Sequence, residues 1–389
     1  MPHKILLTMK DILCSKERLK ITIANGKADR VPSIPDFSNM IPCKLTGKPF
    51  WDIYLYDNPS LFEAYCRAVE YYDIDGWNVV WSGVDFIRKN GHEISKTITS
   101  RTTDRIVERI RYDTPAGDLY ETMTYMPQDP PTKTEKMVKD LEKDFPKIKY
   151  LYSEITGIDD SNIPEFKKMT GDHGVFTLSV TYPGMHYWNE YFDGNLQNAV
   201  YAYYDYPEIF DEWADMADRD LCRQAELYLD QKPDLLLVGG SGTLTLSSPE
   251  LVKKFAIPTI KKICHMARQA GVLTMLHSCG KSMAFLDMLV NETELNCVNP
   301  LEEPPMGDVN LAEVKKLYGS HIALMGNLQT TQVMLKGTPE DVERAARKAI
   351  DDAGEGGGFL LSTGDQCGRD TPPENIFKLV EVARTYGKY

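Results

Sequence analysis

The stretch from Val272 to Gly280 ends in side chains that can bind a metal ion. Its sequence, V-L-T-M-L-H-S-C-G, is an apolar run that stops at His277 and Cys279. Such a run is typical of a buried parallel strand, and alternate side chains of a strand point to the same side. His277 and Cys279 would therefore enter one cavity, and the glycine would let the chain turn away at once. Imidazole and thiolate are both zinc ligands.

A third soft ligand, Cys367, stands in G-D-Q-C-G just after a second apolar run, Gly358–Ser362. Three protein ligands with no obvious fourth favour a catalytic zinc ion with one open position, because closed structural sites usually have four. The alternative is that these thiols are merely small buried hydrophobes, since H-x-C is a short pattern. Four other cysteines occur in helix-like segments and fit that alternative, namely Cys14, Cys66, Cys222 and Cys264.

The composition limits the class of partner. The chain has 389 residues, 42% of them hydrophobic, which is enough for a large core. Its 44 basic and 57 acidic residues give a net charge of −13, and this charge argues against nucleic acid and against an anionic membrane surface. The N-terminus is charged too early for a signal peptide, and no apolar run approaches about 18 residues. We expect a cytoplasmic protein that binds small molecules or other proteins.

The apolar runs alternate with helical stretches in a regular rhythm. Eight such strand–helix units predict an α/β fold, a (β/α)8 TIM barrel, with one domain over residues 1–389. An amphipathic helix, Lys10–Asn25, precedes the barrel, and N-cap residues before proline mark later helix starts at Ser248, Thr338 and Thr371. The eight predicted strands are Val31–Phe37, Gly76–Ser82, Val175–Val180, Leu235–Val238, Val272–Leu276, Cys297–Leu301, Ile322–Met325 and Phe359–Leu361.

Residues from about 95 to 165 differ in character and predict an insertion into the barrel. Two β-rich segments, Ile106–Tyr112 and Leu119–Tyr125, flank the turn sequence T-P-A-G at 114–117. We therefore expect an antiparallel β-hairpin there. The lysine-rich segment Thr132–Lys149 is typical of a loop followed by a solvated helix.

In this fold, chemistry takes place at the C-terminal ends of the strands. The zinc candidates meet that condition, and so do four polar residues that are candidates for binding substrate or supporting the ligands: Asn299, Glu302, Asn327 and Asp365. The loop Gly239–Thr243 also follows a strand, and either a ligand or a tight turn would explain its glycines. The run Gly354–Gly358 precedes the last strand, so it lies at the opposite end and is a poor candidate for binding phosphate.

An aromatic loop follows the third predicted strand. It runs Y-P-G-M-H-Y-W from residue 182 to 188. One interpretation is a pocket wall for a flat substrate with little charge, and the other is that these rings pack the insertion onto the barrel. The candidate substrate-binding residues of this loop are Tyr182, Met185, His186, Tyr187 and Trp188.

Several motifs together resemble the uroporphyrinogen decarboxylase family, and most of all its zinc-dependent cobamide methyltransferase branch. They are S-K-E-R-L-K…A-D-R-V-P near the start, the S-P-E helix start at 248, H-S-C-G at 277, M-G-N-L-Q-T at 325, and G-D-Q-C-G…T-P-P-E-N-I from 364. The resemblance covers the barrel and is densest after Leu235. It implies that His277, Cys279 and Cys367 bind the catalytic zinc ion.

The same resemblance implies methyl transfer. The chain resembles the first methyltransferase of anaerobic O-demethylases, in which zinc acts as Lewis acid while Co(I) of a separate corrinoid protein takes the methyl group of an aromatic methyl ether. The inserted hairpin region and the aromatic loop favour this interpretation, because they suit a methoxyarene better than a small anionic thiol. The alternative is a coenzyme M type enzyme, which transfers methyl from a methylcobamide to a thiol. A uroporphyrinogen decarboxylase is a weaker alternative, because Val31–Phe37 lacks the arginines that grip substrate carboxylates in those enzymes.

The corrinoid should belong to another chain. Corrinoid proteins carry a cobalt-ligating D-x-H-x-x-G motif, and this sequence has none. The expected cofactors are therefore a resident zinc ion and a cobalamin supplied by a corrinoid protein partner.

Overall fold

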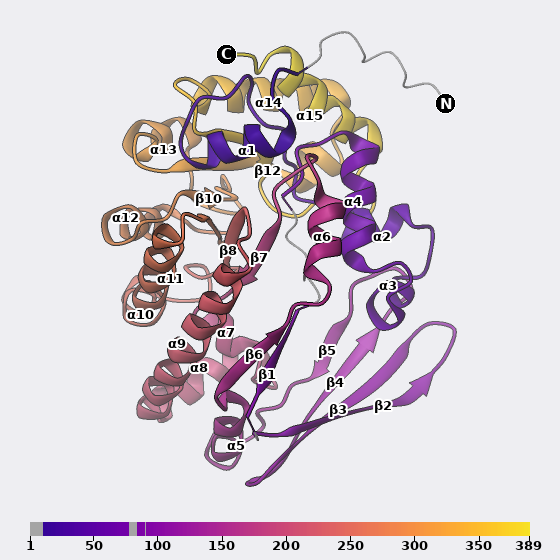
Figure 1. Ribbon diagram of the computed structural model, residues 1–389, viewed down its shortest axis with the longest axis vertical. Coiled ribbons are helices and arrows are strands. Elements are labelled where there is room, and N and C mark those ends of the chain that lie inside the picture. Colours follow the sequence, from indigo (N-terminus) through magenta and orange to yellow (C-terminus); the bar gives the residue numbers. More distant parts are fainter. Residues whose placement is uncertain (1–10, 78–83, 90) are drawn as a thin grey trace.

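A sheet of six parallel strands forms the centre of the computed structural model, which describes residues 11–77, 84–89 and 91–389. Strands that follow one another in the sequence are neighbours in space, as in a barrel built from repeated strand–helix units (Figure 1). The strands are β7 (Thr177–Val180), β8 (Leu235–Gly239), β9 (Leu273–His277), β10 (Cys297–Asn299), β11 (Ala323–Leu328) and β12 (Phe359–Thr363).

Two extended N-terminal segments close this sheet into a ring. Ser33 forms a parallel bridge with Leu361 of β12. The Asp75 N–H then donates to the Ser33 carbonyl at 2.8 Å, and Gly76 forms a parallel bridge with Gly174 just before β7. The first predicted strand is thus confirmed as a barrel member, and the second begins where predicted, although its residues 78–82 lie outside the described part of the chain. The architecture is the predicted (β/α)8 barrel.

Helices cover the outside of the barrel (Figure 1). Predicted N-caps are confirmed at Ser248 and Thr338, whose side chains accept from backbone N–H groups three residues later. The first helix begins later than predicted, at Ser15, and Ile12 is exposed. The barrel helices are α1 (Ser15–Ile23), α4 (Leu61–Tyr72), α6 (Ile163–Thr170), α9 (Pro207–Asp230), α10 (Pro249–Leu251), a π-helical turn (Val252–Ala256), α11 (Ile257–Gln269), α12 (Met283–Glu292), α13 (Leu311–Tyr318), a second π-helical segment (Thr330–Leu335), α14 (Pro339–Ala353) and α15 (Pro373–Thr385).

The predicted insertion forms a four-stranded antiparallel sheet, which is larger than a hairpin. The predicted hairpin is its centre, β3 (Ile106–Thr114) and β4 (Gly117–Tyr125). Edge strands β2 (Glu93–Arg101) and β5 (Thr132–Glu135) flank this pair. The prediction for Thr132–Lys149 is therefore wrong in its first part, because residues 132–135 pair with β4.

Further elements join the inserted sheet to the barrel (Figure 1). Strands β1 (Asp85–Arg88) and β6 (Ile155–Asp159) form an antiparallel ribbon. The helices of this region are α2 (Met40–Leu45), α3 (Phe50–Tyr56), α5 (Leu141–Ile148), α7 (Met185–Asn189) and α8 (Asn195–Asp205), with a 3-10 turn at Lys149–Tyr152.

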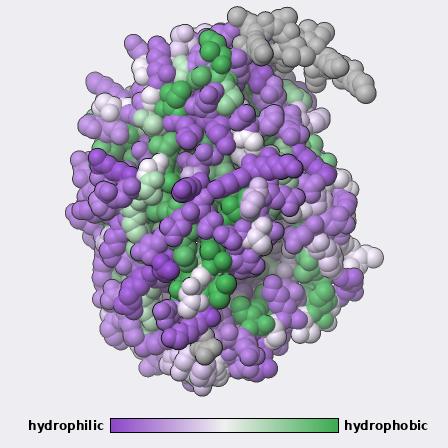
Figure 2. Space-filling view, viewed as in Figure 1, coloured by the Kyte–Doolittle hydropathy of each residue, from purple (hydrophilic) through white to green (hydrophobic). Residues whose placement is uncertain are grey.

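The apolar side chains form two main cores. One fills the barrel and the layer beneath its helices. The other joins α5, α7, α8 and α9 beside the inserted sheet. Figure 2 shows a face that is mostly hydrophilic, with hydrophobic residues gathered along its middle. Within the described residues, every helix is too short or too polar to cross a lipid bilayer.

Candidate metal centre and adjoining cavity

Three potential metal ligands meet at the C-terminal mouth of the barrel. His277 ends β9, Cys279 lies two residues further on, and Asp365 lies two residues after β12. One ligand atom from each lies within 4.8 Å of the other two. These residues come together because β9 and β12 both belong to the ring and their C-terminal ends open on the same side.

This group fits a zinc ion. Ligands of a tetrahedral zinc lie about 2.0–2.3 Å from the metal, and so about 3.4–3.8 Å from one another. A separation below 4.8 Å needs only a small closure to reach that geometry. Imidazole, thiolate and carboxylate are all zinc donors, and three of them leave a fourth position for a substrate.

The electrostatics at this mouth favour a bound cation. Burial, and after it the negative charges of Asp365 and Glu302, raise the pKa of the Cys279 thiol to about 12. Burial also raises the pKa of Asp36 to about 6 and that of Glu302 above its usual value. Several acidic groups thus lie close together where water cannot stabilise their charge, and a divalent cation would do so.

Cys367, the third ligand that the sequence predicts, lies outside this group of three. It is fully buried in the loop that carries Asp365, and its N–H donates to the Asp36 carbonyl at 2.8 Å. Burial raises the pKa of its thiol to about 12. Among the described residues, the carboxylate and not the thiol is therefore the nearest third donor to His277 and Cys279.

The turn after Cys279 needs a glycine, as predicted. Gly280 has φ +83°, and a Cβ atom there would lie 2.0 Å from the Thr245 hydroxyl. Its N–H donates to the Glu302 carboxylate. Glu302, a predicted site residue, thus fixes the turn that carries Cys279 and supports a ligand rather than adding one.

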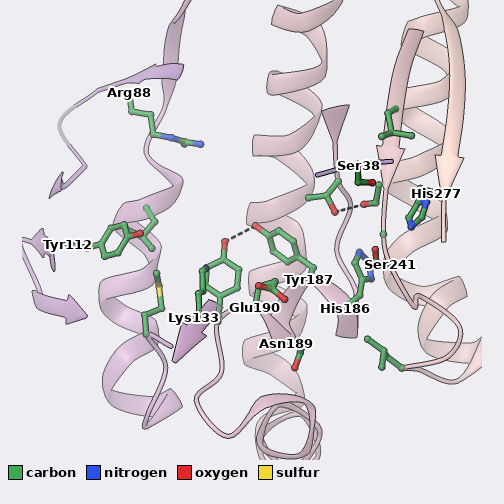
Figure 3. A pocket seen from close by; sticks show the side chains of 18 of the residues that line it. Ser38, Arg88, Tyr112, Lys133, His186, Tyr187, Asn189, Glu190, Ser241 and His277 are labelled. Carbon is green, nitrogen blue, oxygen red and sulfur yellow. Dashed lines mark hydrogen bonds between the residues drawn. The ribbon is translucent and has the colours of Figure 1, made fainter. Parts of the chain in front are cut away.

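A cavity of about 830 Å³ extends from the metal centre towards the inserted sheet. At the barrel end its walls are Asp36, Ser38, His277 and the loop 239–241. Figure 3 shows His277 on one side of the cavity, with Tyr112 and Arg88 on the other. Apolar side chains complete the lining, namely Met137, Leu151, Leu237 and Leu246. This volume suits a small organic ligand.

Some residues of the aromatic loop line this cavity, and others pack in the second core. His186 and Tyr187 line the cavity. Trp188, by contrast, is fully buried and packs edge-on against Phe210 and Phe255 with ring centroids 4.9 Å apart.

Two further members of the loop also lie outside the cavity lining. Met185 belongs to the second core. The hydroxyl of Tyr182 forms a 2.8 Å hydrogen bond with that of Thr243. Trp188 thus packs in the second core, and the loop both packs the insertion and lines the pocket.

Buried polar side chains near the mouth, among them His186 and Asn299, have no hydrogen-bond partner within the described residues. His186 lines the cavity, and neither of its ring nitrogens is bonded. Burial lowers the pKa of His186 to about 4, so its ring is neutral at pH 7. Asn299, which pairs with His277 in register, is 1% exposed, and neither its amide nitrogen nor its amide oxygen is bonded. Asn327, on β11, is also buried. Unpartnered buried groups of this kind are typical of ligand sites.

Several residues that line the cavity are not among those predicted from the sequence. Asp36 lies near the C-terminal end of the first predicted strand, Val31–Phe37, and that position was an available signal. Arg88, His92, Tyr112 and Lys133 come from the insertion and its flanking ribbon. They carry no local signal, because only the packing of the inserted sheet brings them to the barrel.

Comparison with known proteins identifies relatives for the second half of the chain. Residues 193–386 match the family described as uroporphyrinogen decarboxylase (URO-D). The methylcobamide:CoM methyltransferase MtbA of Methanosarcina mazei is 30% identical over 154 residues, which are 39% of this chain and 42% of that protein. The uroporphyrinogen decarboxylase of Mannheimia succiniciproducens is 34% identical over 80 residues, 21% of this chain and 22% of that protein. The chain spans less than half the length of these curated relatives.

A solved structure extends the similarity of fold to nearly the whole chain. A methyltransferase from Methanosarcina mazei superimposes with a TM-score of 0.64 over 96% of this chain and 99% of that one, at 17% identity. The agreement concerns the fold.

Proposed function

The chain belongs to the uroporphyrinogen decarboxylase family, and within it we propose a zinc- and corrinoid-dependent methyltransferase that takes the methyl group of an aromatic methyl ether. The acceptor would be Co(I) of a separate corrinoid protein. The observation that carries this proposal is the position of His277, Cys279 and Asp365 at one end of a cavity with tyrosine and aliphatic walls.

The residues of the metal centre have distinct roles in this proposal. His277 and Cys279 hold zinc together with one group of the loop after β12, which is Asp365 in the arrangement of the structure. When bound, zinc supplies Lewis acidity at the oxygen atom that leaves the methyl group. Asp36 and Glu302 surround the ligands and favour the cation.

The cavity walls would bind and orient the arene. Tyr187 and Tyr191 present ring surface, and Leu237 and Leu246 exclude water from one side. His186, which is neutral and unpartnered, offers one N–H donor and one acceptor to the polar atoms of the ligand. The corrinoid protein would supply the Co(I) nucleophile that accepts the methyl group, and these wall residues would hold the arene for that transfer.

A second candidate function is methyl transfer from a methylcobamide to a thiol. The names of the methanogen relatives favour it. The same three ligands would serve, because a thiol bound at a zinc ion loses its proton more easily. Decarboxylation of uroporphyrinogen has less support, since Arg88 is the one arginine among the described cavity residues and it is already paired with Asp220.

The test is a methyl-transfer assay with the zinc-loaded chain and free cob(I)alamin, using methoxyarenes, methylamines and methylated thiols as donors. We expect methylcobalamin, followed by its absorbance, and the demethylated phenol in equal amount from a methoxyarene alone. Transfer from methylcobalamin to a small thiol, with none from any methoxyarene, would establish the second candidate instead.

A further inference from the structure

A buried amide stands beside the histidine of the metal centre. Asn299 and His277 are partners in the register of the parallel strands β10 and β9, and the Ser278 N–H donates to the Asn299 backbone carbonyl at 2.9 Å. Residues that are opposite one another in such a pair point to the same face of the sheet. His277 lines the cavity, so the Asn299 side chain also projects towards the inside of the barrel.

The side-chain amide of Asn299 is complete neither as a donor nor as an acceptor. Asn299 is 1% exposed, and among the described residues neither its amide nitrogen nor its amide oxygen has a hydrogen-bond partner. Burying these groups unpaired destabilises the folded chain, because they give up their hydrogen bonds to water. An unpaired amide in such a place therefore indicates a partner that it gains only when the site is complete.

The imidazole of His277 can become that partner when a metal ion binds. The metal takes the lone pair of one ring nitrogen, and in a neutral ring the other nitrogen must then carry the proton and can only donate. The Asn299 amide can turn its oxygen towards this N–H, because no other bond fixes its orientation. Histidines that bind metals almost always donate their second N–H to an acceptor of this kind.

The other acceptors around His277 have different positions or partners. Asp36 lies on the first strand, which is opposite β9 in the ring, so it faces His277 across the cavity. Asp365 belongs to the group of three potential ligands, and Glu302 accepts from the backbone of the turn that follows the strand. Asn299 instead approaches His277 along the barrel wall, from the adjacent strand, where it can reach the nitrogen that the metal leaves free.

We propose that Asn299 is a positioning residue whose amide oxygen accepts from the His277 ring and holds that ring in the orientation that binds the metal ion. The proposal rests on the metal site of the proposed function. It gives a role to a side chain that lies behind the cavity lining and so touches no substrate. The amide lowers the stability of the metal-free chain while it is unpaired, and it raises the affinity for the metal when it gains its partner.

The experiment measures the zinc affinity of the full chain by competition with a chelator of known affinity. Asn299→Leu has no acceptor and should bind zinc about 10–100-fold more weakly than the unchanged chain. Asn299→Asp should keep the affinity, because a carboxylate accepts the same hydrogen bond. Asn299→Val is a smaller apolar change that tests the same loss if the leucine variant does not fold.

Two further readouts separate positioning from a purely structural role. Without metal, Asn299→Leu should be more stable than the unchanged chain and yet bind zinc more weakly. Asn375→Leu is the matched control, because it removes a buried amide that is already bonded, so it should be less stable while its folded fraction binds zinc normally. With Co²⁺ in place of zinc, the visible absorption bands report the geometry of the ligands, and these bands should shift in Asn299→Leu and return in Asn299→Asp.

Two results would overturn the positioning role: unchanged zinc affinity and Co²⁺ spectrum in the apolar variants, or a loss of affinity that Asn299→Asp does not restore. Failure of the proposed function is distinct. A chain that binds zinc with the help of Asn299 but transfers no methyl group would keep the positioning role and refute the reaction. Methyl transfer by Asn299→Leu with unchanged zinc affinity would do the reverse. An unchanged chain that binds no zinc would refute both.

Discussion

The two ends of the barrel differ in whether their buried polar groups have hydrogen-bond partners. At the N-terminal end, the Asp75 carboxylate is 1% exposed and bonds to the guanidinium groups of Arg18 and Arg30 at 2.7 and 2.9 Å. It also accepts from the Ser33 N–H at 2.8 Å. Burial alone would raise the pKa of Asp75, but the charges of Arg30 and Arg18 hold it below its usual value.

The C-terminal end leaves its buried polar groups incomplete. Asn299 and His186 lack hydrogen-bond partners among the described residues, and His277, Cys279 and Asp365 offer ligand atoms within 4.8 Å of one another. The contrast indicates which end is built for folding and which for binding: groups that are already paired stabilise the chain, whereas groups that are not stabilise a ligand.

The largest expected effect is the loss of metal from the C-terminal end. The purified chain should hold about one zinc ion, and Cys279→Ala should lose most of it, because two remaining donors cannot hold the ion in a tetrahedral site. Elemental analysis of protein purified under reducing conditions measures this. Cys222→Ala and Cys264→Ala are matched controls that should keep the metal. Full zinc occupancy in Cys279→Ala would show that Cys279 does not bind zinc and would refute the proposed metal site.

The same measurement shows whether Asp365 or Cys367 is the third ligand. We expect Asp365→Ala to lose zinc as Cys279→Ala does, because its carboxylate lies within the group of three. Cys367→Ala should weaken the affinity only about 10–100-fold, the usual effect of a group that supports a ligand. The opposite ranking would establish the ligand set that the sequence predicts.

The next largest expected effect is a loss of stability at the N-terminal end of the barrel. Asp75→Asn should lower the free energy of unfolding by about 3 kcal/mol, because it removes the buried carboxylate that Arg18 and Arg30 share and leaves them only the more exposed Asp11 and Asp29. Denaturant unfolding measures it, and the zinc content of the folded fraction should not change. Asp370→Asn, which breaks exposed ion pairs with Lys44 and Arg369, should cost less than about 1 kcal/mol. Equal effects of the two variants would contradict the contrast between the ends.

The smallest expected effect is a gain in stability. Asn299→Leu should raise the free energy of unfolding by about 1–2 kcal/mol, because it replaces an unpartnered buried amide with an apolar side chain of similar shape. Asn375→Leu is the matched control. Asn375 is equally buried, but its amide donates to the carbonyls of Met334 and Gly337 at 2.9 Å, so this change should destabilise the chain. A loss of stability in Asn299→Leu would show that its amide is paired after all.

The sequence by itself determined the barrel and two of the candidate metal ligands, His277 and Cys279. The alternation of apolar runs and helices is a local pattern, and it placed seven strands within the described residues and the start of the eighth. The H-x-C pair was visible because its two residues share one strand end, where spacing alone sets the direction of the side chains. The turn sequence at 114–117 likewise predicted the pairing of β3 with β4.

Only the tertiary structure decided what surrounds that pair. Tyr187 and Trp188 are neighbours on α7, yet side chains one residue apart on a helix point about 100° apart, so one lines the cavity and the other fills a core. Asp365 and Cys367 share one loop, and the fold of that loop chooses the donor that meets His277. Tyr191 and Lys133 line one cavity because an inserted sheet packs over the barrel mouth, a contact between distant segments that no local pattern encodes.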